Sequence, residues 1–200
     1  MTKLLVATNN PGKVRELEKL LADLPVEIIF PAQEGLALDV EETGETFAEN
    51  ACLKAQTYAQ ASGLLTLADD SGLEVDALGG APGVRSARYA GPGASDEDRY
   101  RKLLAVLSKV PEAQRTARFR CVVALARPDG TVSTADGTCE GQIGFEPRGE
   151  YGFGYDPVFL VDGYEGQTLA ELPPDLKNEI SHRARAVQAA RPLLELLLTS

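Results

Sequence analysis

Two adjacent carboxylates, Asp69 and Asp70, follow a short apolar run and precede Ser71 and a glycine. Side chains on a strand point alternately to opposite faces, so both carboxylates face one site only if the backbone bends between them. A carboxylate at a strand end followed by Ser-Gly is a common way to build a metal or phosphate site. The same residues also favour a polar turn at the exit of a strand. The glycine-rich, nearly uncharged loop of residues 77–89, which ends in two arginines, favours the first interpretation.

Two further segments carry charges that suit a phosphorylated ligand. Residues 8–13, Thr-Asn-Asn-Pro-Gly-Lys, form a strand-to-helix junction with one lysine, and helix N-termini bind phosphate through backbone N–H groups. A plain helix cap is the alternative, because the Walker A pattern is absent. Glu41 and Glu42 lie in an acidic segment with Asp39 and Glu45, where a solvated loop is the alternative to a cation site.

The second half of the chain offers isolated candidates. Gly152–Pro157 looks like a nucleotide-binding glycine loop but lacks the third glycine and the following helix, so an ordinary turn before a strand is the alternative. Lys177, taken alone, is typical of a solvated surface. His182 is the only histidine and therefore cannot form a multi-histidine metal site. Nothing marks an activated serine, so no Ser-His-Asp triad is predicted.

The elements that must position these groups follow from the hydrophobic pattern. Residues 4–7 are a short, fully apolar run, as expected of a buried strand. Apolar residues at helical spacing run from Val14 to Leu24, and Pro25 ends that helix. Residues 26–30 form a second strand, so the chain opens with a β-α-β unit whose strands are expected to be parallel.

Residues 46–49, Thr-Phe-Ala-Glu, are a capping box that opens an alanine-rich second helix, and Gly63 is its expected C-cap. Residues 64–69 form the strand that leads into the two aspartates. A third helix begins at Ser95, with acidic residues in its first turn, and runs to about Val110.

Apolar residues alternate over residues 117–125, which predicts one long half-buried strand. Residues 128–130, Pro-Asp-Gly, turn it into a second long strand. Residues 158–161 form another strand. The pattern from residue 181 onward is helical, and Pro192 should kink or restart that final helix.

We therefore expect an α/β protein with an elongated mixed sheet, long antiparallel strands and flanking helices, arranged as two lobes around a central cleft. The 200 residues suit one generous domain or two small lobes. Residues 1–200 are interpreted as a single domain.

Composition narrows the partners. The net charge of -10 disfavours a nucleic-acid polymer, which is bound through basic surface, but does not exclude a single nucleotide bound through a divalent cation. Cys52, Cys121 and Cys139 have no metal-ligand spacing and are interpreted as reduced thiols of a cytoplasmic protein. We expect no signal peptide and no membrane partner, because no apolar run approaches the roughly 18 residues of a membrane span.

Five blocks of the sequence, taken in order, resemble the inosine triphosphate pyrophosphatase family, the Ham1-like pyrophosphatases of non-canonical purine nucleotides. No single block would be sufficient, but together they span residues 8 to 183. The resemblance implies a similar elongated α/β fold and a homodimer. The blocks are Thr8-Asn9-Asn10-Pro11-Gly12-Lys13, Glu41 to Gly44, Asp69 to Gly91, Gly152 to Pro157, and Ser181-His182-Arg183.

The resemblance implies a Mg²⁺-dependent hydrolase that converts ITP, dITP and XTP to the monophosphate and pyrophosphate, and so removes deaminated purines from the nucleotide pool. Glu41 and Asp70 are the implied magnesium ligands. Asp70 is also the implied catalytic residue, which positions or deprotonates the attacking water, unless both carboxylates serve only the metal. Asp69 is expected to matter less, because alternation turns its side chain away. The implied substrate-binding residues are Thr8, Asn9, Asn10, Pro11, Gly12, Lys13, Ser71, Phe153, Gly154, Tyr155, Asp156, Lys177, His182 and Arg183.

Some of these residues have an expected role. Lys13 and Lys177 neutralise the triphosphate, and Phe153 stacks on the purine. His182 and Arg183 donate hydrogen bonds to the oxygen at purine C6, where adenine carries an amino group instead.

Two other functions remain open at the level of sequence. A Maf-like pyrophosphatase for pyrimidine or modified nucleotides is the other enzyme, but its opening differs from the Ala-Thr-Asn-Asn-Pro-Gly-Lys seen here. A nucleotide-binding sensor with an inactive site is the non-catalytic alternative, and the presence of Glu41, Asp70 and Lys13 argues against it. Pyrophosphate release with and without magnesium separates the enzymes from the sensor.

Overall fold

The computed structural model describes residues 2–199. Residues 2–70, 121–137 and 183–199 form one compact unit, named unit 1 below, and residues 71–120 and 138–182 form the other, unit 2. Each unit has its own hydrophobic core. The interpretation of residues 1–200 as a single domain stays a prediction.

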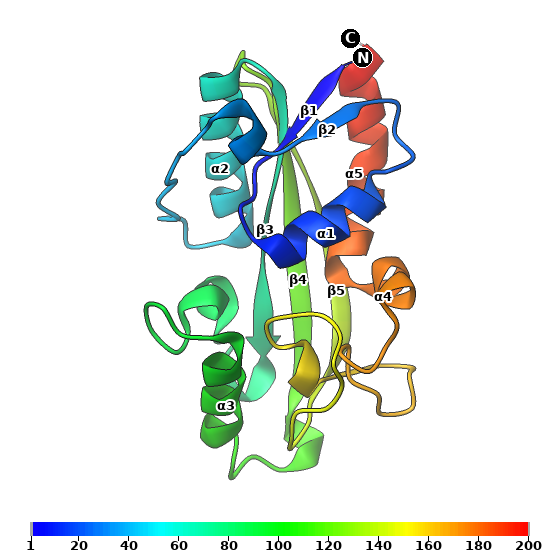
Figure 1. Cartoon of the computed structure of the whole chain (residues 1–200). Coiled ribbons are helices and arrows are strands. Elements are labelled where there is room, and N and C mark those ends of the chain that lie inside the picture. Colours follow the sequence, from blue (N-terminus) through cyan, green and yellow to red (C-terminus); the bar gives the residue numbers. More distant parts are fainter. Residues whose placement is uncertain (1, 200) are drawn as a thin grey trace. The chain divides into compact units, whose positions relative to one another are not determined.

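A six-stranded sheet is the main element of the fold, with the strand order β2-β1-β3-β4-β5-β6 (Figure 1). β1 pairs in parallel with β2 and β3, whereas β5 and β6 are antiparallel. This mixed sheet with its flanking helices confirms the predicted α/β class. The strands are β1 (Lys3–Val6), β2 (Glu27–Ile29), β3 (Leu65–Val75), β4 (Thr116–Ala126), β5 (Val132–Ile143) and β6 (Phe159–Val161).

The helices begin where local chemistry predicts. Thr46 and Glu49 form the expected capping box at the start of α2, and Gly63 ends that helix in the left-handed conformation. Ser95 caps α3 in the same way, with Asp98 as its reciprocal partner. The α-helices are α1 (Pro11–Leu20), α2 (Phe47–Ser62), α3 (Asp96–Val106), α4 (Pro174–Ile180) and α5 (His182–Thr199).

Strand β3 corrects one prediction. Asp69 and Asp70 were expected at a strand end before a turn, but they lie in the middle of a continuous strand, Leu65–Val75. Most of this strand is buried, and it lies between β1 and β4. β1 pairs with the start of the strand, up to Leu67, and β4 is its hydrogen-bonded neighbour on the other edge. This pairing outweighs the local preference of Asp-Ser-Gly for turns.

The opening β-α-β unit and the hairpin of β4 and β5 confirm the predicted connections. β1 and β2 pair in parallel with Leu4 opposite Ile28. The backbone N–H of Arg127 donates to Thr131 O at 2.9 Å, which closes the tight turn between β4 and β5. Because a connection this short joins antiparallel strands, the two long strands run in opposite directions.

Unit 1 is layered around β1, β3 and β4. α1 and α5 cover one face, and α2 lies on the other (Figure 1). The core on the first face contains Leu4 and Val6 of β1, Leu67 of β3, and apolar residues of both helices. Alternation along β3 therefore directs Asp69 toward the α1 and α5 face and Asp70 toward the α2 face.

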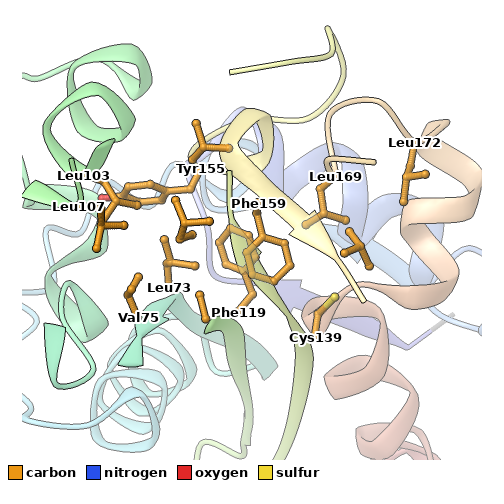
Figure 2. Close-up of a cluster of buried hydrophobic side chains, with 14 residues drawn as sticks. Leu73, Val75, Leu103, Leu107, Phe119, Cys139, Tyr155, Phe159, Leu169 and Leu172 are labelled. Carbon is orange, nitrogen blue, oxygen red and sulfur yellow. The ribbon is translucent and has the colours of Figure 1, made fainter. Parts of the chain in front are cut away.

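Unit 2 has a core of aromatic and aliphatic side chains between strands and α3 (Figure 2). Phe119 of β4 and Phe159 of β6 have ring centroids 4.7 Å apart. The last two apolar residues of β3, Leu73 and Val75, join this core, and so does Tyr155. The loop of residues 152–157 is thereby anchored in the core of unit 2.

Helix ends and short helices account for the remaining differences from prediction. α1 ends at Leu20, before Pro25, and α3 ends at Val106, short of Val110. The loop expected over residues 77–94 contains 3₁₀ turns. The 3₁₀ helices are Pro31–Glu34, Asp76–Leu78, Gly83–Arg88, Glu112–Gln114 and Asp156–Val158.

The C-terminal helices differ more. α4 was not predicted. It is a short helix of seven residues, Pro174–Ile180. α5 runs through Pro192 as one helix, so of the two outcomes predicted for this proline the restart is wrong, while the kink stays a prediction. Pro192 removes a single backbone donor, while Ala190 and Leu194 on either side are buried in the core of unit 1 and keep the helix in register. Across residues 2–199, helices with the length and apolar character needed to span a membrane do not occur.

Candidate active site

The junction between β1 and α1 is built around Asn10. Its side-chain oxygen accepts from the backbone N–H groups of Gly12, at 2.8 Å, and Lys13, at 3.3 Å. Pro11 takes the first helical position, and Thr8 Oγ1 accepts from the Asn10 N–H. The helix cap named as the alternative at this segment is therefore present. It also fixes the backbone of Lys13 at the start of α1.

Asp69 collects two cations on the α1 and α5 face of β3. Lys13 Nζ lies 2.9 Å from Asp69 Oδ2, and Arg183 Nη2 lies 3.1 Å from the same oxygen. Glu16 of α1 pairs with Arg183 through Nη1. The side chains of Asp69 and Arg183 are 1% exposed, so this is a buried charge network. The alternation of side chains along a strand correctly predicted that Asp69 and Asp70 point to opposite faces. It did not predict the ion pairs of Asp69 with Lys13 and Arg183.

Asp70 faces a second cluster on the α2 side. Lys54 Nζ lies 2.7 Å from Glu42 Oε1 and 3.6 Å from Asp70 Oδ1. Gly44 keeps this acidic segment against α2, because its N–H donates to Asn50 Oδ1 at 2.8 Å and an added Cβ would lie 2.7 Å from that oxygen. Glu42 is therefore the glutamate that the described contacts bring to Lys54.

The two aspartates have opposite electrostatics. Burial raises the pKa of Asp70, and the charge of Glu42 adds to that rise against the opposing effect of Lys54. Burial also disfavours ionised Asp69, but the charges of Lys13 and Arg183 outweigh it and hold the pKa of Asp69 well below its usual range. Asp69 is thus paired with two cations through Oδ2, although its buried Oδ1 accepts no hydrogen bond from the described residues, whereas the charge of Asp70 is one that a further cation would stabilise.

A magnesium ion fits the surroundings of Asp70. Its Oδ2 is buried and accepts no hydrogen bond from the described residues. Within residues 2–199, no group of three or more His, Cys, Asp or Glu side chains is placed to hold a metal. Magnesium suits such a site, since it is usually held by one or two carboxylates while waters and substrate phosphates complete its shell.

Unit 2 contains a second set of predicted residues around Lys177. Lys177 Nζ lies 2.5 Å from Asp156 Oδ2 and 4.8 Å from the centre of the Phe153 ring. The same carboxylate oxygen accepts from the Phe153 backbone N–H at 2.8 Å. The side chain of Lys177, a residue of α4, is 4% exposed and paired with the buried Asp156, so the solvated surface expected of it alone is wrong.

The remaining predicted residues of unit 2 differ in their contacts and burial. The hydroxyl of Tyr155 donates to Ser86 O at 2.9 Å, which makes this side chain part of the core. The backbone N–H of Gly154 donates to Asp96 Oδ2 at 2.8 Å. His182 stacks on Phe119, with ring centroids 4.7 Å apart and planes 12° from parallel. Ser71 is half-buried in β3.

Gly152 gives a test of how the loop is held. A Cβ there would lie 2.0 Å from Asp156 Oδ2, the oxygen that accepts from Lys177. We expect Gly152→Ala to reduce the free energy of unfolding by about 1–3 kcal/mol more than Gly154→Ala does. Gly154 is the matched control, since it shares the positive φ but an added Cβ there meets nothing within 4 Å. Urea unfolding of both variants measures the difference, and equal losses would contradict the predicted clash.

Two residues of the unit 1 clusters were missed from sequence. Lys54 was recognisable as the one basic residue within the predicted second helix. Glu16 carried a weaker signal: it lies three residues after Lys13 and directly before the core residue Leu17, and so close to the buried face of α1. The sequence around Lys54 and Glu16 does not indicate which side chains these two residues contact in the fold.

The fold and these charge clusters define an α/β protein in which each face of a central strand carries a buried aspartate next to a partly buried lysine. Solved structures share this fold. A HAM1 protein from Coxiella burnetii matches over 100% of both chains, with a TM-score of 0.87 and 42% sequence identity.

The chain belongs to the Ham1 family, whose profile matches residues 4–193. A dITP/XTP pyrophosphatase of Desulforamulus reducens is 52% identical over 195 residues, which cover 98% of this chain and 96% of the relative. A dITP/XTP pyrophosphatase of Bacillus subtilis is 48% identical, with 98% of each chain covered. The predicted family resemblance is confirmed.

Proposed function

We propose that this chain is a magnesium-dependent nucleoside triphosphate pyrophosphohydrolase. Its substrates are dITP, ITP and XTP, and its products are the monophosphate and pyrophosphate. Family membership and the two pyrophosphatases that match nearly its whole length support this reaction class. The observation that carries the proposal is the buried carboxylate of Asp70, which lies beside Lys54. The next residue along the strand, Asp69, pairs with Lys13.

The lysines supply fixed ammonium groups for the triphosphate oxygens, while their carboxylate partners balance their charge and leave the net positive charge to the bound magnesium. The chain as a whole carries a net charge of -10, so a polyanion is bound only where cations are concentrated. Lys13 and Lys54 are held in place by carboxylates rather than left mobile. Fixed cations stabilise charge that develops on phosphate oxygens without having to reorganise during the reaction.

Asp70 is the proposed catalytic residue. It positions or deprotonates the attacking water, or serves the metal alone. Asp70 and Glu41 are the proposed magnesium ligands, and Glu42, which the structure places beside Lys54, is the neighbouring candidate. A magnesium ion held by these carboxylates would supply positive charge that offsets the charge on the phosphate oxygens. Asp70 is suited to that role because its buried Oδ2 accepts no hydrogen bond from the residues that the structure describes.

The other nucleotide contacts remain proposals taken from the family resemblance. Phe153 stacks on the purine, and Lys177 neutralises phosphate. The position of Lys177 against the Phe153 ring agrees with a shared ligand for the two side chains. The backbone and side-chain contacts proposed beside these are Thr8, Asn9, Asn10, Pro11, Gly12, Ser71, Gly154, Tyr155, Asp156, His182 and Arg183.

The metal requirement gives the direct test of the proposal. Pyrophosphate release from dITP should stop in excess chelator and return when magnesium is added. Manganese should substitute, because the proposed ligands are hard oxygens, and zinc should not. Pyrophosphate release from dITP, XTP, GTP, ATP and dTTP, measured without contaminating inorganic pyrophosphatase, separates this activity from that of a Maf-like enzyme. Full turnover in excess chelator would contradict the site.

The biological setting is part of the same proposal. Hydrolysis of dITP and XTP removes deaminated purines from the nucleotide pool before they are incorporated. We propose a cytoplasmic homodimer without a nucleic-acid polymer or a membrane as partner. Sedimentation equilibrium of the purified chain tests the dimer.

A further inference from the structure

The buried network on the α1 and α5 face contains four charges that balance. Lys13 and Arg183 are the cations, and Asp69 and Glu16 are the carboxylates. They come from α1, β3 and α5, all within unit 1. A buried charge is costly unless it is paired, so each of these groups constrains where the others can lie.

One oxygen atom joins the two cations. Asp69 Oδ2 accepts from Arg183 Nε at 3.2 Å and Nη2 at 3.1 Å, and it lies 2.9 Å from Lys13 Nζ. Lys13 Nζ also donates to the backbone oxygen of Asp69 at 3.4 Å. Within the described residues, Asp69 is therefore the carboxylate that fixes the ammonium group of Lys13.

The rest of the network keeps Asp69 ionised and in place. Arg183 holds Asp69 Oδ2 through two nitrogens, and Glu16 binds the third nitrogen of the same guanidinium group. Arg183 and Lys13 contact the same oxygen of Asp69, so the pairing with Arg183 is compatible with the pairing with Lys13. The Asn10 cap fixes the backbone of Lys13 from the other end, so the lysine is held at both its backbone and its ammonium group.

We propose that Asp69 is a positioning residue, which acts through Lys13 by holding its ammonium group where it meets the triphosphate. This inference rests on the proposed function, in which Lys13 contacts the phosphates. Asp69 itself touches neither substrate nor metal. Its effect on turnover should therefore depend entirely on the presence of Lys13.

A double-mutant cycle tests this dependence. Lys13→Met should lower kcat/KM for dITP by about 10²–10³-fold, the usual loss of one preorganised charge contact. Asp69→Asn should lower it by about 10²-fold, because a misplaced contact is nearly as harmful as a lost one. The double variant should be no worse than Lys13→Met alone. Independent roles would instead multiply the two losses.

Glu16→Gln is the matched control. It removes one negative charge from the same network and from the same guanidinium group, but it leaves the carboxylate that pairs with Lys13. It should lower the melting temperature while reducing kcat/KM far less than Asp69→Asn does. An equal loss in both variants would mean that the network acts only through stability, and would overturn the proposal.

Two further measurements keep the result decisive. If Asp69→Asn does not fold, Asp69→Glu keeps the charge balance while displacing the carboxylate, and the cycle is run with that variant. The same cycle is run on the Kd of inorganic tripolyphosphate, measured by calorimetry. If the wild type does not hydrolyse dITP or XTP, the proposed function fails, but the tripolyphosphate cycle still decides the role of Asp69. Multiplicative losses in that cycle overturn the inference.

Discussion

Asp70→Asn is expected to lower kcat for dITP by at least about 10²-fold while leaving the fold intact. Asparagine keeps the shape of the side chain but removes the charge that a metal ligand or a base requires. Burial raises the pKa of Asp70, and Glu42 adds to the rise. A carboxylate whose pKa is higher in the folded chain than in the unfolded one weakens folding when it is ionised, that is, as pH rises through its unfolded value. Removing it should therefore not lower the melting temperature at pH 7.

Loss of turnover without loss of stability is the signature to measure. Steady-state hydrolysis of dITP and thermal melting at pH 7 give both quantities on one preparation. Asp129→Asn is the control: Asp129 is exposed in the turn between β4 and β5, and asparagine keeps the oxygen that accepts from the Thr131 N–H. It should hydrolyse dITP like the wild type. A near-normal kcat for Asp70→Asn would remove Asp70 from the catalytic site.

The local signals in the sequence predicted the elements well wherever a short segment determines its own structure. Thr46 with Glu49, and Ser95 with Asp98, satisfy the free N–H groups of helices α2 and α3 within a single turn. Such interactions need no knowledge of the rest of the fold. The same is true of the tight turn at residues 128–130, which joins the long strands β4 and β5.

The failures occur where tertiary contacts override local preference. β1 pairs with β3 only as far as Leu67, so the neighbour that carries β3 on through Asp-Asp-Ser-Gly is β4, which lies far away in the sequence. α5 continues through Pro192 because the flanking residues are buried in the core of unit 1. In both cases a turn or break signal was correctly recognised, but packing outweighed it.

The candidate site shows the same division. Lys13 and Asp70 could be named from sequence because they lie in short motifs shared with a known family. Lys54 and Glu16 lie outside those motifs, and their positions beside Asp70 and Arg183 follow only from how α2 and α1 pack on β3. Alternation predicted that Asp69 and Asp70 face opposite sides, but not that each side carries its own cations.

We propose that Arg183, a member of the charge network, also takes part in substrate selection. Its guanidinium group has five N–H donors in one plane, and Asp69 and Glu16 fix the orientation of that plane. The purine of dITP or XTP carries an oxygen at C6, where adenine has an amino group. A rigid donor would favour the oxygen, because an amino group facing it would leave both donors unpaired.

Arg183→Ala should therefore reduce the preference for dITP over dATP. Buried unpaired polar groups cost about 1–3 kcal/mol each, so loss of this donor should lower the ratio of kcat/KM values by roughly 5–150-fold. Most of that change should come from dITP, since turnover of dATP is already poor. The variant will also be less stable, because Asp69 and Glu16 lose their buried partner.

The ratio is the right measurement because the fraction of folded enzyme cancels from it. Both kcat/KM values are determined on the same preparation of wild type and Arg183→Ala. Glu16→Gln is the matched control: it disturbs the same network but keeps the guanidinium group and the two Asp69 contacts that hold its plane, so its ratio should change far less than that of Arg183→Ala. If Arg183→Ala leaves the ratio unchanged while lowering the melting temperature, Arg183 only holds Asp69 in place, and the base is recognised by other residues.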